Sequence, residues 1–108
     1  MRLEIRSRGL ELCAAWKDSI RRRLAFALGR FGARLGRVTV HLAATDAPSG
    51  GSDTRCRIVA RLLLAGRICV EVTDTDLNTA LNRAAQRIGP AVGREFMRRH
   101  DAGRNRGR

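Results

Sequence analysis

The fold is decided by the stretch Val70-Glu-Val-Thr-Asp-Thr-Asp-Leu-Asn-Thr-Ala-Leu-Asn-Arg-Ala-Ala85, in which the period of the apolar residues changes. Its first residues alternate apolar and polar, the pattern of a half-buried strand. From Leu77 onward the apolar residues recur at helical spacing. Between the halves, Asp74 and Asp76 offer oxygens that can cap a helix, and this fits better than a metal site. The stretch therefore predicts a strand that leads directly into an amphipathic helix. The buried stripe expected for this helix is Leu77, Leu81, Ala84, Ala85, Ile88 and Val92.

A β-hairpin precedes the helix. Because alternate residues of a strand face opposite sides, an odd or even number of loop residues (the parity of the loop) decides which residues of the two strands share a face. Strands are expected over residues 54–63 and 67–73. A two-residue turn at Ala65-Gly66 would place Arg61 on the same face as Ile68 and Val70. A loop of three or five residues keeps one face apolar, so we expect a bulged hairpin of that kind. The residues expected to point outward are Arg57, Arg61, Cys69 and Glu71.

The N-terminal half adds two strands and a helix. Leu3 and Ile5 alternate with charged residues, and residues 37–43 alternate in the same way. A helix is expected over residues 14–33, and a loop over residues 45–53. The buried stripe of this first helix is expected to contain Trp16, Ile20, Leu24, Ala27, Leu28 and Phe31.

The resulting order is βαβββα, which predicts an α+β fold. Two amphipathic helices would pack on one face of a four-stranded sheet and leave the other face in water. The architecture is dsRBD-like, because double-stranded-RNA-binding domains have the order αβββα without the first strand. Gly89-Pro90 is expected to kink or break the second helix. We expect one domain over residues 1–100, followed by a disordered basic tail over residues 101–108.

Arginine dominates the charge of the chain. The sequence has 22 basic residues, all arginine except Lys17, against 10 acidic residues, giving a net charge of +12. Residues 1–44 hold ten basic and three acidic residues, residues 76–108 hold eight and three, and residues 45–75 are neutral. Such a charge indicates a polyanionic partner, and the planar guanidinium suits phosphate. A GC-rich genome is an alternative source of arginine.

The candidate RNA-binding residues lie on the two predicted helices. Their faces have few acidic residues to pair with, which favours nucleic-acid binding over an ordinary solvated face. Base stacking on the sheet is not expected, because the predicted strands contain no aromatic residue. The physical argument selects Arg21, Arg22 and Arg23 on the first helix and Arg83, Arg87 and Arg94 on the second. Phe26 falls outside the buried stripe and is either an exposed contact or part of a wider core.

Nothing in the sequence forms a catalytic constellation. His41 and His100 lack a partner motif, and the three cysteines lack metal-ligand spacing. No apolar run reaches the roughly 20 residues that span a bilayer. We therefore expect a cytoplasmic protein that is not an enzyme and has no cofactor, no metal, no small-molecule substrate and no membrane partner.

Three stretches carry a resemblance to a known family: Met1-Arg-Leu-Glu-Ile5, Arg55-Cys-Arg-Ile-Val-Ala-Arg-Leu62 and residues 70–85. Over residues 1–99, the chain resembles the bacterial ribosome-associated inhibitors and hibernation-promoting factors, once called sigma-54 modulation proteins. The resemblance implies a protein that binds the small ribosomal subunit in its mRNA and tRNA channel, near the decoding site. It also implies inhibition of translation in stationary phase or stress. With no second domain, the chain would be a diverged short form.

By position, the resemblance implies RNA contacts for Lys17 and Arg23 on the first helix and for Arg87 and Arg94 on the second. Two alternatives stay open from the sequence. One is a diverged paralogue that acts as a protein-interaction module, such as a homodimer. The other is a general RNA-binding domain.

Overall fold

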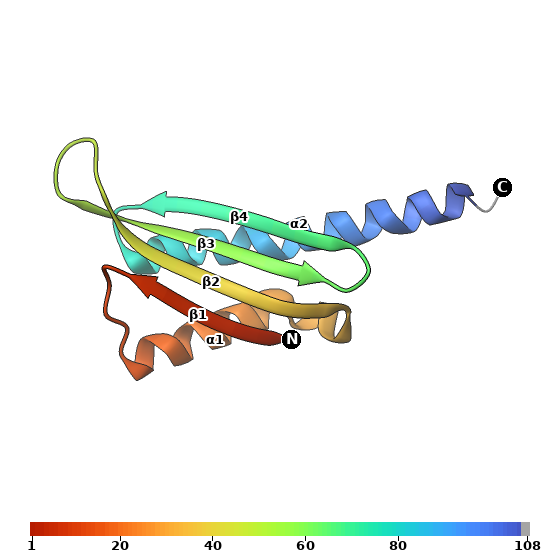
Figure 1. Cartoon of the computed structure of the whole chain (residues 1–108), viewed down its shortest axis with the longest axis horizontal. Coiled ribbons are helices and arrows are strands. Elements are labelled where there is room, and N and C mark those ends of the chain that lie inside the picture. Colours follow the sequence, from red (N-terminus) through yellow and green to blue (C-terminus); the bar gives the residue numbers. More distant parts are fainter. Residues whose placement is uncertain (107–108) are drawn as a thin grey trace.

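The computed structural model describes the backbone of residues 1–106 and the side chains of residues 1–103. Its elements follow the predicted order βαβββα, so the predicted fold class is confirmed (Figure 1). The elements are β1 (Arg2–Arg8), α1 (Ala14–Leu28), the 3-10 helix η1 (Gly29–Arg34), β2 (Leu35–Asp46), β3 (Ser52–Leu62), β4 (Gly66–Asp74) and α2 (Leu77–Arg106).

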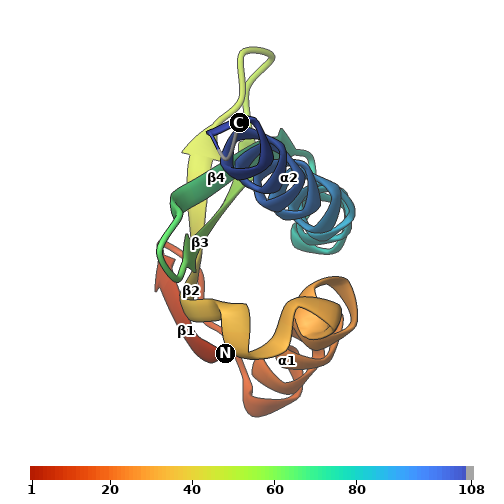
Figure 2. The same cartoon turned by 90° about the vertical axis from the view of Figure 1, so that its right-hand side faces the viewer.

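The four strands form one mixed sheet in the order β1-β2-β3-β4. β1 pairs with β2 in parallel, and the other two pairings are antiparallel. Parallel neighbours need a crossover connection, and α1 with η1 provides it. Both helices lie on the same side of the sheet, so its opposite face is left uncovered (Figure 2).

The register of the β3–β4 hairpin agrees with the parity argument. Leu62 pairs with Gly66, which leaves a loop of three residues, 63–65. Ile58 lies opposite Val70, and both belong to the apolar face. Within this loop, Leu64 has a φ of 63°, which is unusual for a residue with a side chain. Arg57, Arg61, Cys69 and Glu71 are all exposed, as expected for the outward face.

The core lies between the sheet and the two helices. Each helix contributes its predicted stripe, with Trp16, Ala27, Leu77 and Ala85 only partly buried. Cys56 is fully buried in this core, which raises the pKa of its thiol to about 12, so it remains a neutral apolar residue. The largest fully buried side chains are Ile20, Leu24, Leu28, Leu42, Ile58, Leu81, Ile88, Val38, Val40 and Val92.

The first helix is shorter than predicted. α1 ends at Leu28, and the chain continues as η1, in which Gly32 has a φ of +46° and a ψ of −120°. A residue with a side chain rarely adopts this conformation, so Gly32 is where the helical path is broken. Phe31 still reaches the core from η1, which explains why the helical stripe in the sequence extended past Leu28.

The sequence predicted a kink or a break at Gly89-Pro90, and no break occurs, because α2 runs continuously through Pro90. Pro90 is exposed, so water can bond to the backbone carbonyl that loses its usual donor. Gly89 is buried against α1, where an added Cβ would lie 2.8 Å from the backbone oxygen of Ala27. The glycine therefore serves close packing of the two helices.

The C-terminal region also differs from expectation. Residues 101–106 continue α2, where a disordered tail was predicted from Asp101; residues 107–108 lie outside the described residues. Just before this segment, Glu95 forms ion pairs with Arg98 and Arg99, three and four residues further along the helix. The hydrogen bonds from these two arginines lower the pKa of Glu95 to about 2.

Candidate nucleic-acid interface

A groove of about 520 Å³ lies between α1 and α2. A second hollow of about 500 Å³ continues it toward the C-terminal part of α2, and Arg30 lines both. Among the described residues, neither lining contains an acidic side chain. The polar and charged residues of this groove are Arg22, Arg23, Arg30, Arg34, Asn82, Gln86 and His100, and together with Phe26 they are called the helix groove below.

Arg23 connects the two helices across the helix groove. Its Nη1 donates to the Oδ1 atom of Asn82 at 2.9 Å, and its Nη2 donates to the Oδ1 atom of Asn78 at 2.8 Å. The two asparagines are one turn apart on α2, so both can face α1. The Arg23 guanidinium also lies 5.7 Å from the ring centroid of Trp16. Because all three partners are uncharged, Arg23 is held in place without losing its positive charge.

Arg30 and Arg34 are positioned by aromatic rings. The Arg30 guanidinium lies 4.7 Å from the ring centroid of Phe31, and that of Arg34 lies 4.5 Å from the centroid of Phe96. The two rings pack against each other with centroids 5.7 Å apart. Cation–π contacts orient a guanidinium while leaving N–H groups free to bind an anion.

Phe26 is the exposed aromatic residue of the groove. Its side chain is 94% exposed, which decides between the two sequence interpretations in favour of a surface position. It lines the same hollow as Arg22 and Arg30. An exposed ring beside cations can stack on a base whose phosphates the arginines bind.

The structure brings only two of the seven predicted residues into the helix groove, namely Arg22 and Arg23. Helical geometry at about 100° per residue places Lys17 and Arg21 on the flank of α1 that faces away from α2. The same geometry places Arg83, Arg87 and Arg94 about a third of a turn from the groove-lining residues of α2. All five are exposed. The predicted residues therefore divide among the groove and two outer flanks.

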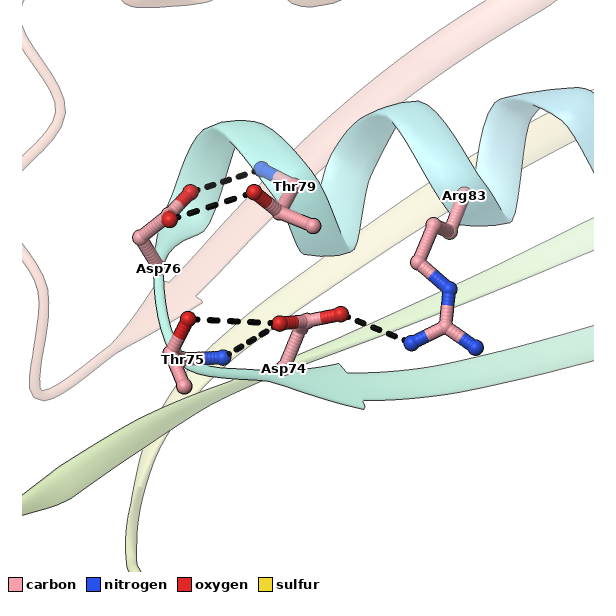
Figure 3. Close-up of polar contacts among 5 residues, drawn as sticks. All are labelled: Asp74, Thr75, Asp76, Thr79 and Arg83. Carbon is pink, nitrogen blue, oxygen red and sulfur yellow. Dashed lines mark hydrogen bonds and ion pairs between the residues drawn. The ribbon is translucent and has the colours of Figure 1, made fainter.

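Two of the flank arginines are engaged in ion pairs. Arg21 contacts Asp18 at 3.2 Å, and Arg83 contacts Asp74 at 2.7 Å at the junction between β4 and α2 (Figure 3). The hydrogen bond from Arg83 is the main cause that holds the pKa of Asp74 below its ordinary value. Part of the positive charge expected on the flank of α2 is thus neutralised within the protein.

The same junction identifies the cap of α2. Asp76 accepts hydrogen bonds from the backbone N–H of Thr79 at 2.7 Å and from its hydroxyl at 3.1 Å (Figure 3). This is the capping role expected from the sequence. Among the described residues, no group of three or more metal-ligating side chains occurs here or elsewhere.

Sequence reasoning missed several groove residues. Arg30 follows Arg23 by seven residues, or two helical turns, so its spacing could have identified it. Asn82 and Gln86 carry no charge and gave no such signal. Arg34 reaches Phe96 only because η1 replaces the last turns of the predicted helix.

The comparisons with known proteins come from solved structures, since neither a protein-family model nor a curated protein matches this sequence. The Protein Y N-terminal domain of Thermus thermophilus matches with a TM-score of 0.72 and 28% identity, covering 87% of this chain and 98% of that one. A ribosomal subunit interface protein from Coxiella burnetii also has a TM-score of 0.72, over 90% of this chain and 99% of its own. At 8% identity, this second match concerns the fold alone.

No helix within residues 1–106 combines the length and the apolarity needed to cross a membrane. Over most of its length, the chain has the fold of the ribosome hibernation factors, the family that its sequence resembles.

Proposed function

We propose that this chain binds RNA of the small ribosomal subunit through the helix groove, near the decoding site, and thereby inhibits translation under stress or in stationary phase. A ribosome-related role is supported by the sequence resemblance to the hibernation-promoting factors and by the fold shared with the Protein Y N-terminal domain, which is 28% identical over 87% of this chain. The proposal includes a cytoplasmic location, no cofactor and no small-molecule substrate. The binding unit would be residues 1–100.

One observation carries the proposal: arginines held by uncharged partners line a groove in which none of the described lining residues is acidic. Arg23 is held by two asparagines and a tryptophan, and Arg30 by a phenylalanine ring. A guanidinium that is positioned but not neutralised loses little conformational freedom when it binds phosphate. Such a groove is suited to a polyanion.

In the proposed complex, Arg22 and Arg30 bind backbone phosphates and Phe26 stacks on an unpaired base. These contacts suit single-stranded or irregular RNA, whose bases are accessible for stacking. The flank residues Lys17 and Arg21, and likewise the row on α2, would bind phosphates on either side of the groove. The members of that row are Arg83, Arg87 and Arg94.

The test is co-sedimentation of the protein with purified small subunits across a salt series. The double variant Arg22→Gln/Arg30→Gln should bind on the order of tenfold more weakly at low salt. Its affinity should also depend less on salt, with a log–log slope smaller by about 1.4, because two phosphate contacts are lost. Arg104→Gln/Arg106→Gln provides a control with the same change in charge.

Three results would count against the proposal. If the wild type stays off small subunits at low salt, the proposal fails. If the groove and control variants weaken binding equally, the groove is not the binding site. If duplex RNA competes as well as small subunits do, the protein is a general RNA binder. A salt-insensitive dimer without RNA affinity would instead identify a protein-interaction module.

A further inference from the structure

The uncovered face of the sheet is also rich in arginine. Strand pairing places the outward-pointing residues of all four strands on this face. The acidic residues among them are Glu4, Asp53 and Glu71. The arginines among them are Arg2, Arg6, Arg8, Arg37, Arg55, Arg57, Arg61 and Arg67. Four of these arginines, Arg55, Arg57, Arg61 and Arg67, lie in residues 45–75, whose net charge is zero, so the charge distribution along the chain does not reveal them.

Arginines oppose each other directly on this face. Arg2 pairs with Arg37 across β1 and β2, and Arg61 pairs with Arg67 across β3 and β4. Like charges opposite one another in a sheet are destabilising. Only part of this charge is compensated, as in the contacts of Glu4 with Arg6 at 3.3 Å and with Arg37 at 3.6 Å. A bound anion would remove the repulsion.

The arginines line two hollows at opposite ends of the face. One, of about 490 Å³, is lined in part by Arg2, Arg37 and Arg61. The other, of about 370 Å³, is lined in part by Arg6, Arg8, Arg55 and Arg57. His41 lies in the second hollow, opposite Arg6 on one side and Arg57 on the other. Each hollow therefore offers several guanidinium groups to one anionic ligand.

The chemistry of the face favours phosphate as the ligand. Protein interfaces usually have an apolar centre with aromatic anchors, and none of the strand residues is Phe, Tyr or Trp. The face therefore lacks the large aromatic rings on which RNA-binding sheets stack bases. What it offers is guanidinium groups spread across four strands, which suits contact with a nucleic-acid backbone.

We propose that the open sheet face binds the phosphodiester backbone of a second RNA segment, separate from the segment in the helix groove. Because the helices and the open face lie on opposite sides of the sheet (Figure 2), one protein would be held between two RNA segments. This surface is independent of the helix groove and goes beyond the function proposed above.

His41 provides a site-specific probe of this binding. In the free protein its pKa is lowered, first by burial and then by the charges of Arg57 and Arg6, while Glu4 opposes the effect. Arg8, Arg55 and Glu71 line the same hollow. A phosphate bound there would add negative charge beside the imidazole, so the pKa of His41 should rise on binding, by about one pH unit.

The experiment is an NMR titration of His41 in the full chain at low salt, with and without an oligouridine. A length of about 12 nucleotides is enough for the probe to cover the face. The variant Arg6→Gln/Arg55→Gln/Arg57→Gln should bind the oligonucleotide on the order of tenfold more weakly. Its log–log salt slope should be smaller by about 2. The charge-matched control is Arg104→Gln/Arg106→Gln/Arg108→Gln, which should keep most of the affinity.

The groove variant Arg22→Gln/Arg30→Gln separates the two proposals, because it should keep the rise in the pKa of His41. An unchanged His41 pKa at saturating oligonucleotide would overturn the sheet-face proposal, even if the triple variant were unstable. The proposal would also be overturned if the sheet-face triple variant and the control triple variant lost the same amount of RNA affinity. If the sheet triple kept its RNA affinity but lost binding to intact small subunits, the face would dock an acidic protein instead.

Discussion

The helix groove and the open sheet face are both basic, but their arginines are held in different ways. In the groove, Arg23 and Arg30 contact asparagine side chains and aromatic rings. On the sheet, arginines such as Arg61 and Arg67 lie opposite one another. The first arrangement stabilises the empty protein, whereas the second destabilises it until an anion binds. Equal charge can therefore have opposite effects on folding.

The largest effect is expected where the groove depends on backbone packing, at Gly89. In Gly89→Ala, the new Cβ would lie 2.8 Å from the backbone oxygen of Ala27, so the helices must separate. We expect the free energy of unfolding to fall by about 1–3 kcal/mol, as for other overpacked sites. Urea unfolding followed by circular dichroism measures this change.

Gly93→Ala is the matched control, on the same helix. Its new Cβ would lie 3.6 Å from Phe31, an ordinary contact. The variant should gain about 0.5–1 kcal/mol, because alanine favours the helix over glycine. If Gly89→Ala were equally stabilising, close approach of the helices would not explain this glycine.

A smaller effect is expected for Arg23→Ala, which removes two hydrogen bonds between the helices. We expect a loss of about 1–2 kcal/mol in the free energy of unfolding. Since the partners are uncharged amides, the loss should persist in salt of about 0.5 M. Arg22→Ala, one residue earlier, should change stability by less than about 0.5 kcal/mol. A loss that disappeared in salt would mean that charge, and not the amide contacts, holds Arg23.

The smallest effect has the opposite sign and belongs to the sheet face. Arg61→Gln should raise the free energy of unfolding by about 0.2–1 kcal/mol at low salt, because it relieves the repulsion with Arg67. High salt should abolish the gain. Arg87→Gln, an exposed change of equal charge on α2, serves as the control. If Arg87→Gln raised the free energy of unfolding by as much, the gain would come from the lower net charge of the chain. The proposed contrast between the two surfaces would then be wrong.

Most of the fold could be predicted because it depends on local periodicity. Alternation located the strands, and parity selected the hairpin loop that joins Leu62 to Gly66. The errors occurred where a local rule conflicted with tertiary packing. Gly89-Pro90 suggests a helix break, yet its effect depends on Ala27, which is distant in sequence. The early end of α1 depends on the backbone conformation of Gly32.

The candidate site was less predictable than the fold. A helical projection shows that Arg22, Arg83 and Arg87 are exposed, and the structure agrees. It does not show which flank of one helix faces the other, because that depends on how both helices pack on the sheet. It also cannot show that Asp74, from the preceding strand, pairs with Arg83. The residues that hold Arg23 are uncharged, so a search for charge patterns in the sequence does not find them.

The strand order has a consequence for self-association. β1 and β4 are the edges of the sheet, and such edges can recruit a strand from another molecule. The sequence of β1 places Arg2, Arg6 and Arg8 along one of them. A second copy joining there would bring its own arginines against these, and charged edges of this kind are a known protection against aggregation. We therefore expect the arginines of β1 to disfavour the pairing of two copies of this highly basic chain along this edge.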